Sequence, residues 1–209
     1  MKLAEPKQGI LTDGILKEII DDPRADGLVF RNEVCDRSLD HMEFYECVFE
    51  NIEFTESMQE CMFVDVIMDH CDLSNVDLRN SLFRRVQFRN CRMTGTDLSG
   101  SRFQDVSFQE IQAGYINFNG SRFTRVRFEN AVMDHAGVSM CEQKDLEIRT
   151  CRLEHTEFFQ TKLSGVDLSD SEIGDLTVTP ESLPGLTVNE EQAAAFAALF
   201  GLIVKTKTY

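Results

Sequence analysis

The histidines and cysteines are the side chains of this sequence best suited to hold a metal ion or to act as a nucleophile. His41, His70, His135 and His155 are scattered along the chain, and the cysteines form no Cys-x-x-Cys pair. A zinc site needs three or four clustered ligands, and we expect no third ligand in register with His135 and His155. No phosphate-binding loop, nucleophile elbow or His-Glu-x-x-His motif is present. The sequence therefore predicts no enzyme, no cofactor and no metal site.

Carboxylates are the most abundant charged groups, and they are unevenly distributed. The chain of 209 residues has a formal net charge of −15. Residues 1–60 carry 15 acidic and six basic groups, residues 61–140 carry nine of each, and residues 141–209 carry 12 and six. Two interpretations of the acidic ends stay open. They form either a solvated surface that aids solubility or a binding surface for a basic partner.

The elements that position these groups follow a repeat of five residues. Bulky inward-type residues recur at every fifth position from Phe63 to Val178, and Gln143 is the one clearly polar member. Two positions before each inward residue stands a second, mostly small residue. Cys47 and the five cysteines after it occupy this second position, and Cys35 alone lies outside the pattern. A period of five fits neither a helix nor a strand. Held over this length, it predicts a solenoid of stacked repeats in which the thiols are structural.

A second period of twenty indicates the shape of the coil. Ser81-Leu82-Phe83, Ser101-Arg102-Phe103 and Ser121-Arg122-Phe123 recur at this spacing, so four pentads form one turn. The pattern resembles the pentapeptide-repeat family, whose motif reads small residue, Asp or Asn, Leu or Phe, and two polar residues. Cys71-Asp72-Leu73-Ser74-Asn75 and Val166-Asp167-Leu168-Ser169-Asp170 are clear matches. The resemblance implies an all-β solenoid, a right-handed quadrilateral β-helix with four repeats per coil.

The repeat divides the chain into three parts. Residues 1–26 do not follow it, and we expect a cap or tail with a short helix over Gly14–Ile20 that begins at Asp13. Residues 27–178 are expected to form the β-helix. Its first inward positions include Val29 and Val34, and one residue is missing near 55–62, which predicts an irregular side there.

The part after the repeat, residues 179–209, is expected to close the last coil. Asn189 has the character of a helix N-cap, with Glu190 in the first turn. We expect a helix that ends before Gly201 and is followed by a short strand. Two roles for this apolar end stay open, a cap on the last coil or a dimer interface. The residues concerned are Phe196, Leu199, Phe200, Leu202 and Val204.

Outward positions at the period of twenty predict how charges meet across turns. One column alternates in sign and is expected to form a structural ladder, because stacked strands lie ~4.8 Å apart. Its members are Asp65, Arg85, Asp105, Arg125 and Asp145. We expect the arginines of the middle coils to be neutralised in this way, so they form no nucleic-acid patch.

The acidic first coils are the predicted partner-binding face. Glu33, Glu53 and Asp72 are expected to share a column there, which leaves like charges stacked. The full set of candidate binding residues is Glu33, Glu43, Glu46, Glu50, Glu53, Glu56, Asp65, Asp69 and Asp72.

The layout of the whole chain is similar to the topoisomerase-directed branch of the family, which includes the Qnr quinolone-resistance proteins and MfpA. The resemblance implies an acidic rod that mimics DNA, binds DNA gyrase or topoisomerase IV, protects against quinolones or toxins, and dimerises through its C-terminal end. The unbroken repeat leaves no room for the long loops of many Qnr proteins, which puts quinolone protection in doubt. The alternative is a scaffold or adaptor with another partner and no mimicry. No apolar stretch resembles a signal peptide or a membrane span, so a bacterial cytoplasmic location is expected.

Overall fold

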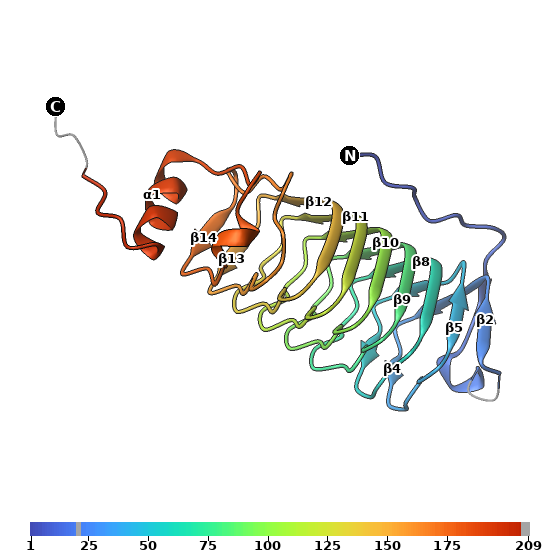
Figure 1. Ribbon diagram of the computed structural model, residues 1–209. Helices are drawn as coiled ribbons and strands as arrows, with labels where there is room; N and C mark the ends of the chain where they lie inside the picture. Colours follow the sequence, from blue (N-terminus) through green and yellow to red (C-terminus); the bar gives the residue numbers. More distant parts are fainter. Residues whose placement is uncertain (20–21, 206–209) are drawn as a thin grey trace.

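The computed structural model describes residues 1–19 and 22–205 and shows a β-helix built from parallel strands (Figure 1). No helix in these ranges is long and apolar enough to cross a membrane. The elements are β1 (Thr12–Asp13), η1 (Leu16–Glu18), β2 (Arg24–Asp26), β3 (Leu28–Arg31), β4 (Val34–Cys35), β5 (Glu43–Tyr45), β6 (Val48–Glu50), β7 (Glu53–Phe54), β8 (Met62–Asp69), β9 (Leu82–Arg89), β10 (Arg102–Gln109), β11 (Arg122–Glu129), β12 (Glu142–Arg149), β13 (Arg152–Glu154), β14 (Glu172–Gly174), η2 (Pro180–Ser182) and α1 (Glu190–Leu199).

Each turn has four sides, as the period of twenty predicts. In the turn 61–80 the sides are residues 61–65, 66–70, 71–75 and 76–80. β8 to β12 each span the first two sides and pair in parallel with a shift of twenty, for example Phe83 with Phe103. The other two sides are joined mostly by isolated bridges such as Asp77 to Asp97. The predicted four-sided β-helix is confirmed.

The corners explain why the period is five. From Glu60 to Gln160, every fifth residue has a positive φ, including bulky residues such as Arg85 (52°) and Tyr115 (59°). This left-handed backbone turns the chain through a corner, and non-glycine residues adopt it at a cost of ~1–2 kcal/mol each. Stacked hydrogen bonds and the packed interior must offset that cost at each corner.

Stacked phenylalanines fill the interior. Phe63, Phe83 and Phe103 lie on successive turns with ring centroids 4.9 Å apart. The predicted inward positions from Phe63 to Leu168 are buried, except Gln143. The Gln143 amide donates instead to the carbonyl oxygens of the next turn, at 3.0 and 3.1 Å.

The first two turns are one residue shorter than the others. Strand pairs there are shifted by nineteen, as between Cys35 and Phe54, whereas β8 and β9 are shifted by twenty. The short side recurs, because Leu39 follows Cys35 inward by four residues and Met58 follows Phe54 by four. The prediction of Val34 as an inward residue was wrong. Its side chain is 52% exposed, and Cys35 takes its place in the core.

The two ends differ from the expectations in detail. The expected helix over Gly14–Ile20 is a single 3₁₀ turn whose N-cap is Ile15, and Ile20 lies outside the described residues. The predicted C-terminal helix is confirmed as α1, with a complete capping box at Asn189. The predicted strand after it was wrong, because residues 202–205 are not in a strand.

Candidate partner-binding surfaces

The histidine column is more complete than the sequence indicated. The rings of Tyr115, His135 and His155 stack on successive turns, with centroids 4.6 and 4.8 Å apart. Asp175 occupies the next position, and its Oδ2 lies 3.8 Å from His155 Nδ1. Even so, no cluster of three His, Cys, Asp or Glu side chains suited to a metal occurs in residues 1–19 and 22–205.

The cysteines are free thiols, and all seven are buried. Burial raises the pKa of Cys47 to about 11 and that of Cys61 to about 12. Because the thiolate is the reactive form, these groups are poor nucleophiles at neutral pH. They pack as small core residues, and Cys35 does so as well.

Two arginine–aspartate pairs form along the predicted charge column. Arg85 Nε and Nη2 donate to both oxygens of Asp65 at 2.6 and 2.5 Å, and Arg125 binds Asp105 in the same way at 2.6 Å. Within the described ranges no salt bridge joins Arg85 to Asp105 or Arg125 to Asp145. Direct salt bridges therefore form within two separate pairs, and the expected ladder continues between the pairs only as longer-range attraction, of Arg85 to Asp105 and of Arg125 to Asp145.

Both paired aspartates remain charged at neutral pH. Burial would raise the pKa of Asp65, but hydrogen bonds from Arg85 and the Lys7 N–H outweigh it and hold the pKa below its ordinary value. The Arg125 guanidinium likewise lowers the pKa of Asp105 against the opposing effect of burial. The corner thus presents fixed carboxylates that accept further hydrogen bonds.

Those carboxylates anchor the first residues of the chain. Residues 1–13, here called the N-terminal strap, lie along the β-helix across several turns (Figure 1). The anchoring contacts are Gly9 N–H to Glu46 Oε2 (2.9 Å), Lys7 N–H to Asp65 Oδ1 (2.9 Å), Ala4 N–H to Asp105 Oδ1 (3.3 Å) and the Met1 amino group to Glu147. The sequence did not reveal this arrangement, because backbone N–H groups that any residue supplies make most of it.

The carboxylates predicted to form one binding face lie on three sides of the β-helix. Glu43 is on the first side, Glu50 and Asp69 pair on the second, and Glu53 and Asp72 bridge on the third. A single acidic face was therefore the wrong description. The acidic surface wraps around the first turns.

Several members of the set are occupied within the chain. Asp65 is 5% exposed, so it cannot contact a partner freely. Glu33 does not share a column with Glu53, because Val34 stands opposite Glu53. The Glu33 carboxylate accepts a hydrogen bond from the Leu16 N–H at 3.1 Å.

Four other members differ in whether an arginine neutralises them. Glu50 Oε2 pairs with Arg31 Nε at 2.6 Å, and Arg92 lies 3.5 Å from Asp72. Glu53 and Glu56 are exposed and have no ion-pair partner in the part of the chain that the structure describes. These two are the carboxylates most available to a partner.

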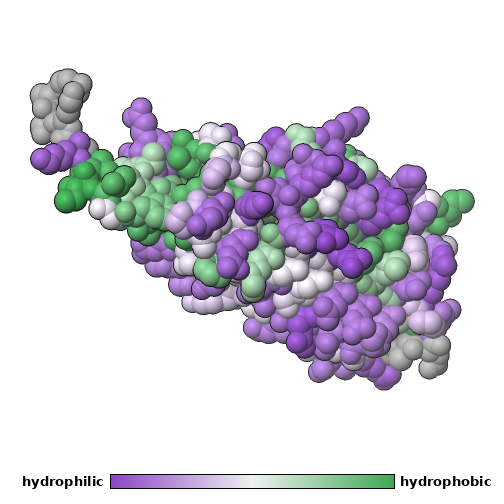
Figure 2. Space-filling view, viewed as in Figure 1, coloured by the Kyte–Doolittle hydropathy of each residue, from purple (hydrophilic) through white to green (hydrophobic). Residues whose placement is uncertain are grey.

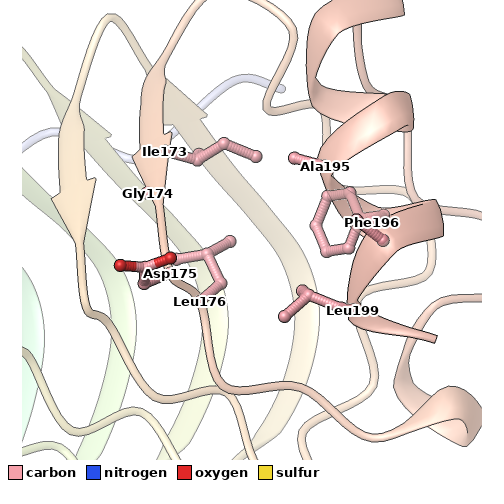
Figure 3. A pocket seen from close by; sticks show the side chains of 8 residues that line it. Ile173, Gly174, Asp175, Leu176, Ala195, Phe196 and Leu199 are labelled. Atoms are coloured by element: carbon pink, nitrogen blue, oxygen red, sulfur yellow. The ribbon is translucent and has the colours of Figure 1, made fainter. Parts of the chain in front are cut away.

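The C-terminal end is apolar and partly open. Phe196 on α1 is 8% exposed and packs on the last turn, so it serves as the cap. A cavity of about 370 Å³ remains between α1 and the segment Ile173–Leu176, with Leu199 at its edge (Figure 3). The other four side chains of the predicted apolar set are exposed, and a hydrophobic area lies beside the C-terminal residues in Figure 2. They are Leu199 (52%), Phe200 (43%), Leu202 (64%) and Val204 (51%).

Comparison with known proteins supports the repeat. Residues 38–118 and 61–138 match the family profile described as a pentapeptide repeat region. No curated protein matches the sequence. Among solved structures, a trypsin-treated variant of QnrB1, a plasmid-mediated fluoroquinolone resistance protein, is 23% identical over 87% of this chain and 90% of that one, with a TM-score of 0.36.

A second solved structure is HetL, a pentapeptide repeat protein involved in heterocyst differentiation regulation from the cyanobacterium Nostoc sp. strain PCC 7120. It is 12% identical over 80% of this chain and 90% of that one, with a TM-score of 0.40. At these identities and TM-scores neither likeness indicates what the surface of this chain binds.

Proposed function

The chain belongs to the pentapeptide-repeat family, and we propose that it is an interaction protein whose acidic first turns enter the DNA-binding groove of DNA gyrase or topoisomerase IV. The proposal rests on the density of negative charge along the first two turns. Residues 24–61 make two turns, because Arg24 pairs with Glu43 and Glu43 with Met62. At ~4.8 Å per turn they occupy ~10 Å of axis, with ten acidic and three basic groups.

This density is close to that of duplex DNA. Seven net charges over that length are one per ~1.4 Å, against one per ~1.7 Å of DNA axis. The charges also surround the rod on three sides, as phosphates surround a duplex. A groove that binds DNA through basic side chains would therefore meet a field of similar sign and strength.

The apolar C-terminal end supports a second part of the proposal. An end-to-end homodimer would cover Leu202, Val204 and the open cavity beside α1, and it would double the length of the rod. Exposed apolar patches of this kind commonly mark interfaces. Leu202→Asp is expected to halve the mass seen in analytical ultracentrifugation, and an unchanged mass would show that this end only caps the last turn.

A specific observation favours a second function, an adaptor with another partner and no DNA mimicry. Asp65 and Glu46, both in the predicted binding set, already bind the strap. Fewer carboxylates are then free than the sequence indicates. In an adaptor of this kind, the acidic surface keeps the protein soluble and anchors its own N-terminal strap.

A gyrase supercoiling assay, with and without a fluoroquinolone, separates the two functions. Mimicry predicts inhibition or drug protection by the wild-type chain, with a several-fold loss in Glu53→Gln/Glu56→Gln. The matched control Glu154→Gln/Glu172→Gln removes the same charge from exposed positions near the other end and is expected to keep the effect. No inhibition, protection or binding at micromolar protein would remove the topoisomerase proposal and leave the adaptor.

A further inference from the structure

One outward column on the first side of the β-helix has an arrangement that works against folding. In register, Leu82 stands opposite Arg102, and Arg102 stands opposite Arg122. Like charges directly opposite on neighbouring strands destabilise a sheet. The expectation that the middle arginines are all neutralised within their columns was therefore wrong for this column.

The two arginines differ in their counter-charges. Arg122 Nη2 lies 2.7 Å from Glu142, whereas Arg102 has no salt-bridge partner within residues 1–19 and 22–205. Arg84, in the adjacent outward column, has none in those ranges either. Arg84 and Arg102 are exposed. They are thus uncompensated cations on a chain whose net charge is −15.

An apolar hollow lies next to these cations. Tyr45, Met62 and Leu82 are half-buried on the turns before Arg102. They line a depression of about 470 Å³ that Arg84 and Arg102 border. The surface therefore changes along the rod from apolar to cationic within about two turns, each ~4.8 Å high.

We propose that this surface, here called the arginine hollow, binds a segment of a partner protein in which apolar side chains are followed by carboxylates. The apolar side chains would cover Met62 and Leu82, and the carboxylates would pair with Arg84 and Arg102. Guanidinium groups suit this role because they bind carboxylates in a two-pronged geometry. The proposal concerns a different side of the rod from Glu53 and is independent of topoisomerase binding.

The surroundings favour a peptide over nucleic acid. A polyphosphate gains nothing from the apolar half of the hollow, and where it extends past Met62 it would meet Glu43, which repels it. A short acidic segment stays within the cationic half. At physiological salt the Debye length is ~8 Å, so the local cations act on such a segment more strongly than the distant negative charge.

Fluorescence anisotropy with the full-length chain tests this proposal. The probe is a labelled short peptide with leucines followed by glutamates, and the comparison probes replace the glutamates by glutamines or the peptide by a single-stranded oligonucleotide. We expect the acidic peptide to bind, the glutamine peptide to bind at least ~tenfold more weakly, and Arg84→Gln/Arg102→Gln to raise the Kd at least ~tenfold. The control Arg89→Gln/Arg149→Gln, on the second side, should change the Kd less than ~twofold.

Each other result contradicts the proposal. Absence of binding at millimolar peptide, an equal effect of the control variant, or tighter binding of the oligonucleotide would overturn it. A stability measurement gives an independent check. If Arg102 is retained for binding, Arg102→Gln should leave the thermal unfolding midpoint unchanged or raise it, whereas a clear decrease would show that Arg102 serves the fold.

Discussion

Replacement of Phe103 by leucine tests whether the stacked rings stabilise the β-helix beyond simple burial. Phe103 is 1% exposed and contacts four other rings. The contacts are Phe83 at 4.9 Å and Phe123 at 5.4 Å, both stacked, Phe118 at 5.6 Å, edge-on, and Phe108 at 6.0 Å, tilted. At the low end of ~0.5 kcal/mol for each pair, the ring geometry contributes about 2 kcal/mol in addition to burial.

Phe158 provides the matched control. It is also 1% exposed, but no described aromatic ring stacks on it. Phe158→Leu removes the same atoms and should cost about 1 kcal/mol from the loss of packing. Phe103→Leu should cost about 3 kcal/mol, because it also loses the ring contacts.

Urea unfolding followed by circular dichroism measures the difference, since the chain contains no tryptophan. The free energy of unfolding of Phe103→Leu should fall about 2 kcal/mol further than that of Phe158→Leu. Equal losses within ~0.5 kcal/mol would refute the reasoning and show that the rings act only as bulk.

Three further predictions concern charge, thiols and the strap. The pKa of Asp65 is lowered in the fold, so its carboxylate stabilises the fold fully above the unfolded pKa of ~3.9, and this stabilisation is lost as pH falls through the folded pKa. In Asp65→Asn the free energy of unfolding should therefore depend less on pH below pH ~4. An unchanged slope would contradict this. Ellman's reagent should label none of the cysteines until the chain unfolds, since all seven thiols are buried and out of its reach, and fast labelling of the folded chain would count against that reasoning. Deletion of residues 1–9 should increase amide exchange around Asp65 and Asp105 while the core strands stay protected, and identical exchange would show that the strap does not dock.

The repeat made the interior highly predictable. A side chain at every fifth position has one direction in a four-sided coil, so Phe63 to Leu168 could be placed inward from spacing alone. Val34 was misplaced because the first turns have nineteen residues, and the short side falls where Val34 and Cys35 are both plausible core residues.

The surface was harder to predict, because it depends on contacts between distant segments. The strap reaches Asp65 and Asp105 through backbone N–H groups, which leave no mark in the sequence. The column of Arg102 and Arg122 follows from the period of twenty, but the period does not show which of the two finds a counter-charge; Glu142 pairs with Arg122 and leaves Arg102 without a salt bridge in the described residues.

Competition with DNA for gyrase is the most direct test of mimicry. Gyrase is loaded with a fluorescently labelled duplex, and the full-length chain is added at increasing concentration. Mimicry predicts that the chain displaces the duplex, that the effect weakens as salt rises, and that Glu53→Gln/Glu56→Gln displaces it several-fold less well than Glu154→Gln/Glu172→Gln does. Simultaneous binding of chain and duplex to gyrase, or no binding of the chain at micromolar concentration, would contradict it.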